Sequence, residues 1–582
     1  MHLTFLLLML LLIPGLHPHL ASAGEPSTDH DVVIVGAGAA GLYAAYELDN
    51  LGFDVLVLEA TNRHGGRVYP STLGTVGIER GAEEVYGPQN NFVYGDIVDL
   101  LGGDALTPIF TEGSTQDTLI SMDSGNTCWV STGSCGSDTD IADWENFWGH
   151  SHASDPTDEL ISNHLATDHG ISSSHRAWHL YEESPGALYG TSVTRIGLRS
   201  LFREGNLWPF SGGVYGLQYT GYLDALNSLY FDQVVSRIAY NSPVTVVDTS
   251  GIKPVAIDAN GVYHYADAIL VTVSVGVLQA EIIDFVPDLP AAKVTAYNTL
   301  GMGNGMKIFL RFSSTFWDSS KLFYVITEGP AGGCWTPAKY QPGTTNDVFT
   351  CYSMGLDAEF MSALPNDAAR FAQALSDLDL VFGGLATTNF VEGSIQDWNA
   401  EPYVRGTYSY PAPGSYPNGP SSMRQVLAQP VGGEVFFAGE ATHNSAPATV
   451  PGAIQTGERA AGEIDVALDG PPLPNAPSAD FSPSTTSGPP PLDVVFTDTS
   501  SQTPTSWNWD FGDTGSSVDQ NPTHQYTVPG TYTVSLTATN PDGSHTRVKP
   551  HLIFVPEPGG RMQLVSGILG LAALYPQRWR RS

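Results

Sequence analysis

The sequence predicts an α/β domain built on a parallel sheet, interleaved with an α+β region and followed by an all-β domain. Three observations support this fold class. An almost wholly apolar run at 31–35 leads through a glycine-rich turn into a helical pattern, as expected of a parallel strand that is buried on both faces. A similar order of strand, glycine turn and helix recurs at 434–461. After a proline-rich segment at 471–477, short alternating strand patterns replace the helices.

The first glycine turn has the spacing of a dinucleotide-binding loop. Gly36, Gly38 and Gly41 stand at G-x-G-x-x-G spacing before a helix expected at 39–51. The first glycine permits a tight turn, the second lets the backbone approach a pyrophosphate, and the third lets the helix approach the strand, while the helix N-terminus faces the phosphates. A second apolar run ends on Glu59, 18 residues after Gly41, where a carboxylate can accept hydrogen bonds from ribose hydroxyls. We therefore expect a Rossmann-like dinucleotide site.

The residues that follow this turn indicate which dinucleotide is bound. Glu59, Arg63, Gly66 and Arg67 stand in a run that resembles the E-x-x-x-R-x-G-G-R signature of the flavin amine oxidase superfamily. The resemblance implies FAD as the cofactor. It also implies a GR2-type FAD-binding domain with an interleaved α+β substrate domain.

Three later segments extend the resemblance. Residues 77–87 are similar to the E-x-G-A-x-x-x-x-G stretch beside the flavin, and residues 398–410 to the W-x-x-x-P-x-x-x-G-S-Y-S stretch of polyamine oxidases and histone-lysine demethylases. Residues 434–461 match the segment whose helix N-terminus faces the flavin ring, where the helix dipole stabilises the charge of the reduced flavin. The resemblance implies these cofactor-binding residues, with Val244 at the adenine and Glu440 at the ribityl–pyrophosphate part: Gly36, Gly38, Ala40, Gly41, Glu59, Arg63, Gly66, Arg67, Gly81, Ala82, Val244, Gly439, Glu440, Val450 and Ala453.

The catalytic residues implied by the resemblance are Lys307 and Tyr408. Lys307 matches the lysine that, in relatives, holds a water against flavin N5 and assists reoxidation; the alternative is a strand lysine with its head in solvent. Tyr408 matches an aromatic wall along which the substrate amine is held by apolar and cation–π contact. Ala446 and Thr449 replace the facing aromatic residue of many relatives, which leaves room for a bulkier substrate. Thr407 stands where monoamine oxidases carry a flavin-linking cysteine, so we expect non-covalent FAD.

The function implied by the resemblance is oxidation of the C–N bond of an amine. In the family, hydride passes from the carbon beside the nitrogen to flavin N5, water hydrolyses the imine, and oxygen reoxidises the flavin to give hydrogen peroxide. Glu84 and Tyr86 are candidates to bind the second amino group of a polyamine, and equally ordinary loop residues. Thr449 is a further candidate for contact with the substrate.

Two other functions stay open. An L-amino-acid oxidase of the same fold would need an arginine to clamp the substrate carboxylate, for which Arg80, Arg203 and Arg405 are candidates. A surface-displayed binding protein with an inactive flavin domain is the third possibility. The presence of Lys307, Glu440 and the complete glycine turn argues against it.

Composition narrows the partners and the compartment. The 60 acidic and 24 basic residues give a net charge of −36, which disfavours nucleic acids and anionic membranes. This charge would attract small cations such as polyamines, and it equally fits a general role in solubility or salt tolerance. Four cysteines fit an oxidising compartment. Of their three possible pairings, proximity favours Cys128 with Cys135 and Cys334 with Cys351. No cysteine or histidine spacing indicates a metal site, so we expect none.

Both ends of the chain resemble sorting segments. Residues 1–23 have the apolar run and small-x-small pattern of a secretory signal. Residues 556–582 resemble the PEP-CTERM sorting signal of Gram-negative bacteria, with an apolar run too short to span a bilayer. We therefore expect an exported protein, periplasmic, extracellular or at the cell surface, from a Gram-negative bacterium.

The segment before this tail resembles a PKD domain. Residues 478–555 contain alternating strand patterns and the run W-N-W-D-F-G-D at 507–513. The resemblance implies an immunoglobulin-like sandwich with Trp509 and Phe511 in its core. Such modules are usually spacers or weak adhesive units, so this domain and the tail would attach the protein to a cell surface or matrix.

The predicted boundaries place the amine oxidase domain at 24–470 and the linker at 471–477. FAD-binding parts are expected at about 31–88, 205–290 and 395–465, and substrate-domain parts at about 89–204 and 291–394.

Four local expectations lie within these parts. The patterns predict one glycine-opened helix at 212–229, and an amphipathic helix within 357–382. They also predict paired strands at 261–265 and 268–273, and an alternating strand at 306–312 with Lys307 at a polar position.

Overall fold

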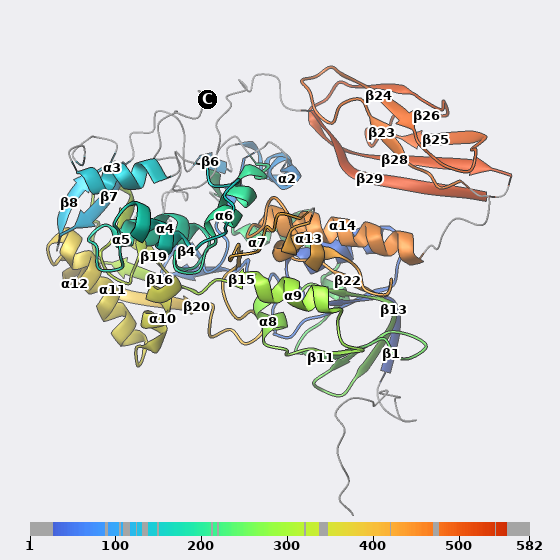
Figure 1. Cartoon of the computed structure of the whole chain (residues 1–582). Helices are drawn as coiled ribbons and strands as arrows, with labels where there is room; N and C mark the ends of the chain where they lie inside the picture. The colour runs from blue at the N-terminus through green and yellow to red at the C-terminus, as the bar shows by residue number, and fades with distance from the viewer. Residues whose placement is uncertain are drawn as a thin grey trace, which may run out of the picture.

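The computed structural model describes residues 27–555 apart from short internal segments (Figure 1). These segments are 88–90, 104–105, 109–116, 124, 131–134, 136–137, 148–150, 211–213, 218–219, 319–321, 337–346, 420, 469–476 and 542. The predicted secretory signal, the sorting tail and nearly all of the predicted linker lie outside the described residues.

A largely parallel sheet forms the core of the first domain. β1 (Ser27–Val35) pairs in parallel with β2 (Val55–Leu58) and with β13 (Tyr263–Val271). β13 pairs in parallel with β22 (Val435–Phe437), so one strand separates the two strands that lead into the glycine turns (Figure 1). The described strands run in the order β10–β2–β1–β13–β12–β11–β14. The strands not yet introduced are β10 (Ile238–Ala239), β11 (Val244–Asp248), β12 (Val255–Asp258) and β14 (Asp284–Val286).

Two helices that follow the glycine turns pack against each other. α1 (Ala39–Asn50) and α14 (Val450–Leu468) share one hydrophobic core with β1. Gly457 permits this approach, because a Cβ there would lie 2.3 Å from the Ala40 carbonyl oxygen. The other face of the sheet carries α8 (Val275–Gln279), α9 (Ala291–Thr299) and α13 (Met423–Ala428).

A second, mixed sheet forms the core of the interleaved domain. Its strand β16 (Gly305–Phe312), which lies between β20 and β19, is almost wholly buried. One face of β16 packs on α10 (Gly355–Ala363) and α11 (Asp367–Phe382), and Phe309 on the other face packs against the hairpin β3–β4. The described strands run β20–β16–β19–β18–β17–β7–β8: β7 (Asp117–Met122), β8 (Asn126–Trp129), β17 (Leu322–Ile326), β18 (Gly333–Trp335), β19 (Val348–Met354) and β20 (Phe390–Asp397).

Helices and short strands connect the two sheets. The helices are α2 (Phe92–Leu101), α3 (Thr139–Asn146), α4 (Ile161–Asp168), α5 (Trp178–Tyr181), α6 (Leu198–Asn206), α7 (Tyr222–Leu229) and α12 (Leu385–Asn389). The strands are β3 (Pro70–Leu73), β4 (Val76–Glu79), β5 (Glu84–Tyr86), β6 (Leu106–Pro108), β9 (Val214–Leu217), β15 (Gly301–Met302) and β21 (Ser409–Tyr410).

Two local expectations were wrong, and a third was confirmed. The segment predicted as one helix at 212–229 contains the strand β9 before α7, because β9 pairs with both β5 and β6. β13 is continuous instead of two paired strands, and its antiparallel partner is β12. The helix expected within 357–382 is α11, which begins after Pro365 and is capped by the Asn366 side chain through the N–H of Ala369; the shorter α10 precedes it.

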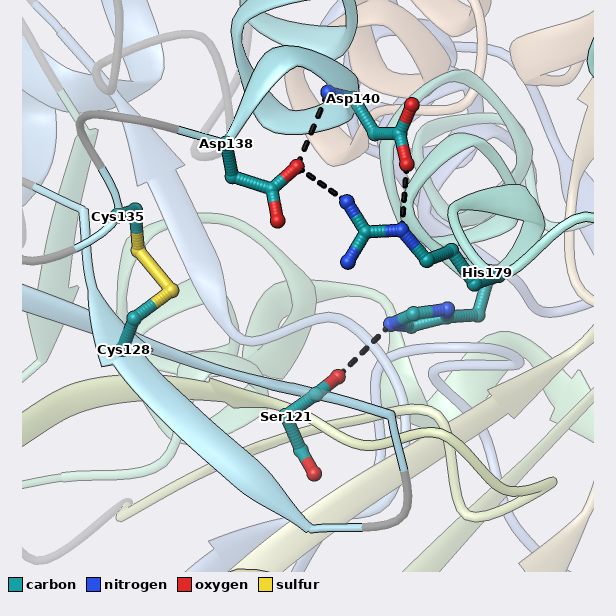
Figure 2. The surroundings of a disulfide bond; sticks show 7 residues. Ser121, Cys128, Cys135, Asp138, Asp140 and His179 are labelled. Carbon is teal, nitrogen blue, oxygen red and sulfur yellow. Dashed lines mark hydrogen bonds and ion pairs between the residues drawn. A yellow bond between two sulfur atoms is a disulfide. The ribbon is translucent and has the colours of Figure 1, made fainter.

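Two disulfides confirm the pairing favoured by proximity. Cys334 and Cys351 lie opposite each other on β18 and β19. Cys128 on β8 is bonded to Cys135, just before α3 (Figure 2). Figure 2 also shows the start of α3, where Asp138 accepts a hydrogen bond from the Asp140 N–H at 3.0 Å. The disulfide thus ties the edge strand β8 to the start of α3.

The C-terminal domain is a two-sheet sandwich with its own core. Trp509 and Phe511 are 0% and 1% exposed, so their predicted burial is confirmed. The strands are β23 (Phe481–Pro483), β24 (Leu492–Asp498) and β27 (Thr523–Tyr526) in one sheet, and β25 (Ser506–Asp510), β26 (Ser516–Ser517), β28 (Gly530–Asn540) and β29 (Gly543–Val555) in the other. Across the described part of the chain, every helix is too short or too polar to cross a membrane.

Candidate active site

A cavity of about 660 Å³ lies between the largely parallel sheet of the first domain and the mixed sheet of the interleaved domain. Its lining comes from the first glycine turn, from the segment around Gly439, and from strands of the second sheet. The volume is in the range of small-molecule and cofactor sites. Two segments from opposite ends of the domain therefore meet at one site.

The glycine turn has one tight position and one open position. Gly36 has φ +107°, and a Cβ on Gly41 would lie 2.1 Å from the Gly36 carbonyl oxygen. By contrast, a Cβ on Gly38 would meet nothing within 4 Å. The open side of Gly38 lines the cavity at the start of α1, where a phosphate would meet the helix N-terminus.

Glu59 stands at the end of β2 beside this turn. Its carboxylate accepts hydrogen bonds from the N–H of Ala37 and the N–H of Thr61, both at 2.9 Å, and from the Thr61 hydroxyl at 2.8 Å. These donors fix the carboxylate at the cavity wall, where oxygen lone pairs remain for ribose hydroxyls. Gly66 lies against the turn, since its Cβ would be 3.2 Å from the Gly38 Cα.

Glu440 is the centre of a buried polar cluster on the opposite wall. Its carboxylate contacts Arg67 at 2.9 Å and accepts hydrogen bonds from the hydroxyl of Ser409 at 2.7 Å and the N–H of Ala448 at 2.9 Å. Burial alone would raise the pKa of Glu440, but Arg67 and Arg424, with these hydrogen bonds, lower it below its usual value. The carboxylate is therefore ionised and fixed beside the cavity.

The helix after Glu440 begins at the cavity. The Thr449 hydroxyl accepts a hydrogen bond from the Gly452 N–H at 2.9 Å and donates one to the Ala446 carbonyl at 3.0 Å, so it caps the helix. Val450 and Ala453, in the first turn, line the cavity as Thr449 does. Ala446 lies behind this lining and is 0% exposed.

Lys307 is buried, and the alternative of a head group in solvent is wrong. The residue is 5% exposed. Its ammonium group donates hydrogen bonds to the carbonyl oxygens of Glu79 at 3.0 Å and Gly81 at 2.8 Å, and to the Glu83 carboxylate at 3.1 Å. The hairpin β3–β4 and the segment after it cover this face of β16, which explains why a polar strand position is buried.

Aromatic side chains surround the lysine end of the cavity. The hydroxyl of Tyr408 donates to the Ala187 carbonyl at 2.9 Å, which fixes its ring in the wall. Tyr324 and Trp335 stack with ring centroids 5.9 Å apart, and Tyr352 also lines the cavity. Sequence reasoning missed these three; Trp335 and Tyr352 each follow a cysteine of the buried disulfide, which was the available signal.

Carboxyl groups lie at the same end. Burial, and then the Glu83 carboxylate, raises the pKa of Glu84 to about 7, while Lys307 opposes the rise. Tyr86 lines the cavity beside it and packs on Trp208, with ring centroids 5.3 Å apart. A carboxyl group that titrates near neutral pH thus faces an aromatic chamber.

Three family models match the chain. A model of NAD(P)-binding Rossmann-like domains matches residues 34–99, one of PKD domains matches residues 473–555, and one of flavin-containing amine oxidoreductases matches residues 137–465. The last match covers more than half of the chain.

The chain belongs to the flavin-containing amine oxidoreductase family. FAD is therefore the expected cofactor of this flavin amine oxidoreductase, and its C-terminal sandwich is a PKD domain. A PKD domain and two disulfides are consistent with an extracellular protein.

Curated relatives include polyamine oxidases and histone demethylases. Polyamine oxidase 5 of Oryza sativa subsp. japonica is 28% identical, over 75% of this chain and 87% of the relative. Lysine-specific histone demethylase 2 of Homo sapiens is 28% identical, over 74% of this chain and 53% of the relative. Lysine-specific histone demethylase 1 homolog 3 of Arabidopsis thaliana is 27% identical, over 76% of this chain and 30% of the relative. The flavin amine oxidoreductase thus spans about a third to a half of the length of these demethylases.

Solved structures share the fold of the first two domains. A putrescine oxidase bound to putrescine has a TM-score of 0.60 at 18% identity, covering 76% of this chain and all of that chain. A cyclohexylamine oxidase from Brevibacterium oxydans IH-35A has a TM-score of 0.58 at 20% identity, with the same coverage.

The cavity of the flavin amine oxidoreductase fits the expected FAD. The open side of Gly38, the Glu59 carboxylate and the start of α14 offer sites for pyrophosphate, ribose and ring. Of the predicted cofactor residues, Gly36, Gly38, Ala40, Glu59, Arg63, Gly66, Arg67, Gly81, Ala82, Val244, Gly439, Glu440, Val450 and Ala453 line the cavity. Gly41 lies behind the turn against β1.

The arginines proposed for an amino-acid substrate lie elsewhere. Arg80 donates to Ile395 and Ser394, and Arg203 to backbone carbonyls that include that of Ala153. Arg405 is exposed, with φ +58°. Among the described residues, the guanidinium groups that line the cavity are those of Arg63 and Arg67, and Arg67 is paired with Glu440.

Proposed function

We propose that this protein is an exported, FAD-dependent amine oxidase that oxidises a C–N bond of a primary or secondary amine of the polyamine class. The observation that carries the proposal is the composition of one cavity. Its glycine-turn end suits a dinucleotide, and its other end combines aromatic rings with the Glu84 carboxyl group. Rings and carboxylates are the groups that bind alkylammonium ions.

The aromatic chamber would position the amine. Tyr408 is fixed by its bond to Ala187 and offers a ring face to the alkyl chain beside the nitrogen. Tyr352, opposite Lys307 on β19, and Trp335, on the following strand β18, extend the wall. Together they exclude water around the carbon to be oxidised, and binding to rigid rings reduces the entropy lost in the reaction.

Glu84 would bind the second amino group of a diamine or polyamine. Its carboxyl group faces the chamber, and Tyr86 lies beside it. Once ionised, it would pair with a distal ammonium and so place the reacting nitrogen further along the chamber. Thr449 contributes less, because its hydroxyl is occupied in capping α14.

Bound FAD supplies the hydride acceptor and, through its reaction with oxygen, the source of hydrogen peroxide. The residues proposed to hold it are those of the glycine turn, Glu59, Arg67, Glu440 and the first turn of α14. Thr407, 3% exposed, offers no thiol for a covalent link, which supports non-covalent binding. Lys307 is the residue proposed to assist reoxidation.

Export is proposed from the secretory-signal pattern at residues 1–23 and from the two disulfides. The PKD domain would act as a spacer or a weak adhesive unit, and residues 556–582 as a sorting tail.

The test is peroxide release by the FAD-loaded protein with spermidine, a monoamine and a panel of L-amino acids. We expect release with spermidine, and less with the monoamine, which cannot reach Glu84 and the reacting position at once. Release with amino acids alone would support an L-amino-acid oxidase instead. Failure to take up flavin would support a binding protein without this activity.

The amino-acid oxidase is the weaker candidate. Such an enzyme needs a guanidinium group free to clamp a carboxylate bidentately. Of the cavity-lining arginines in the described chain, Arg67 is engaged by Glu440, and Arg63 lies over the Tyr69 ring at 3.9 Å.

A further inference from the structure

The Lys307 ammonium group uses all of its donors within the protein. An ammonium group has three N–H bonds. Those of Lys307 meet the carbonyls of Glu79 and Gly81 and the carboxylate of Glu83, at 2.8–3.1 Å. A water molecule could gain a hydrogen bond from this lysine only by displacing one of these acceptors.

Glu83 is held on two sides. One carboxylate oxygen accepts the Lys307 ammonium at 3.1 Å, and the other accepts the indole N–H of Trp335, also at 3.1 Å. Lys307 also lies 5.4 Å from the centre of the Trp335 ring. All three residues line the cavity, and they come from three separate segments: the loop after β4, the strand β16 and the strand β18.

The pair leaves little positive charge at this end of the cavity. Lys307 contributes one positive charge and Glu83 one negative charge in direct contact. Burial raises the pKa of Glu79 to about 8, so this neighbour is mostly protonated at neutral pH. Burial and the Glu83 carboxylate raise the pKa of Glu84 to about 7, so Glu84 adds a partial negative charge at the same end. Within the poorly screened interior, the field of a lysine depends on whether its counter-ion is present.

We propose that Glu83 is a positioning residue that clamps Lys307 between Trp335 and the Glu79–Gly81 backbone and cancels its charge toward the flavin site. The inference rests on the proposed function, since it concerns FAD in this cavity. The ion pair restrains both the electron affinity of the bound flavin and its reaction with oxygen. Removing Glu83 would release the lysine charge when the neighbouring Glu84 is held neutral, as in a Glu84→Gln parent.

The test measures the midpoint potential of bound FAD in the full-length protein, without substrate. Every variant is made in a Glu84→Gln parent, so that Glu84 cannot ionise in place of Glu83. Glu83→Gln and Glu83→Ala both remove the negative charge, so either can carry the test if the other does not fold. At a given applied potential, we expect the ratio of reduced to oxidised flavin to rise at least tenfold in each variant. For a two-electron couple, this corresponds to an increase of about 30 mV in the midpoint potential. Reoxidation by oxygen, followed by stopped flow, should become faster.

Two further variants separate a field effect from a structural effect. Glu83→Gln combined with Lys307→Met should return the potential toward that of the Glu84→Gln parent, because both charges are gone. Glu328→Gln removes one charge at a residue that does not line the cavity and bonds Ser121 and Gly125. It should leave the potential unchanged.

Each result decides the proposal. An unchanged or lower potential in a Glu83 variant that keeps its flavin would overturn it, while leaving the amine oxidase proposal intact. An equal shift in Glu328→Gln, or loss of flavin from both Glu83 variants, would also overturn it. A wild-type protein that binds no FAD would overturn both proposals.

Discussion

Glu59 illustrates how one side chain can join a strand end to a nucleotide site. Its two oxygens are held by Ala37 and Thr61, so the carboxylate is oriented before any ligand arrives. Such preorganisation reduces the cost of binding, because little side-chain freedom is lost.

Glu59→Gln should weaken FAD binding. Hydrogen bonds to charged groups contribute about 1.5–3 kcal/mol, so we expect the dissociation constant to rise roughly 10–100-fold. Fluorescence titration of the apoprotein with FAD measures it. Asp232→Asn, at an exposed position outside the cavity lining, is the matched control. Equal affinities in wild type and Glu59→Gln would contradict the ribose role.

Glu84 predicts a pH dependence that distinguishes diamines from monoamines. Its pKa, raised to about 7 by burial, means that the carboxyl group is protonated below that pH and ionised above it. Only the ionised form pairs with a distal ammonium. The KM for a diamine should therefore fall as the pH rises through about 7, beyond any change seen for a monoamine of similar length.

Glu84→Gln is the variant that checks this assignment. It removes the ionisation and keeps the volume, so the additional pH dependence of the diamine KM should vanish. Steady-state kinetics from pH 6 to pH 8.5, with both substrates, provide the comparison. If the variant keeps the wild-type difference between diamine and monoamine, another group binds the distal nitrogen.

At the scale of elements, the contact between α1 and α14 brings the two glycine turns together. The contact needs a glycine at position 457, where a Cβ would lie 2.3 Å from the Ala40 carbonyl oxygen and 3.2 Å from the Ala44 nitrogen. Both atoms are backbone and cannot move aside without moving α1. The geometry of the phosphate end therefore depends on a residue that does not line the cavity.

Gly457→Ala should destabilise the protein by about 1–3 kcal/mol, as overpacking does, and weaken FAD binding. Gly462→Ala on the same helix is the control, because a Cβ there meets nothing within 4 Å. That change should be neutral or stabilise by up to about 1 kcal/mol. Urea unfolding of both apoproteins gives the comparison. Equal stabilities would mean that the helices adjust freely.

The success of sequence reasoning also differs between elements. The glycine turn, β2 and α14 could be predicted because their chemistry is local: each requires particular residues at fixed spacing. β9 could not, because its strand conformation comes from pairing with β5 and β6 rather than from its own pattern. The same holds for the aromatic wall, which is set by the pairing of β18 with β19.

Lys307 shows the limit for single residues. Its strand could be predicted, and the resemblance implied a place at the flavin, but its partner Glu83 could not be predicted. The two residues are 224 positions apart, and only the folded hairpin β3–β4 places the following loop against β16. A pattern that alternates along one strand does not show what covers each face.

At the scale of the whole molecule, the catalytic domains and the PKD domain have separate cores. A chain that ends at Leu468 should therefore keep bound FAD and its turnover number within about twofold, since distant and independent changes leave each other unaffected. Flavin content and peroxide release in the shortened and full-length proteins check this. Loss of flavin on shortening would mean that the sandwich supports the cavity.

The central claim is that two distant segments hold one FAD in a cavity whose other end binds an amine. The most direct measurement is anaerobic titration of the FAD-loaded protein with spermidine, followed by the visible absorbance of the flavin. We expect complete bleaching at a stoichiometric amount of amine, and restoration of the absorbance when oxygen is admitted. A bound flavin that no amine bleaches, or a cavity that takes up no flavin, would contradict it.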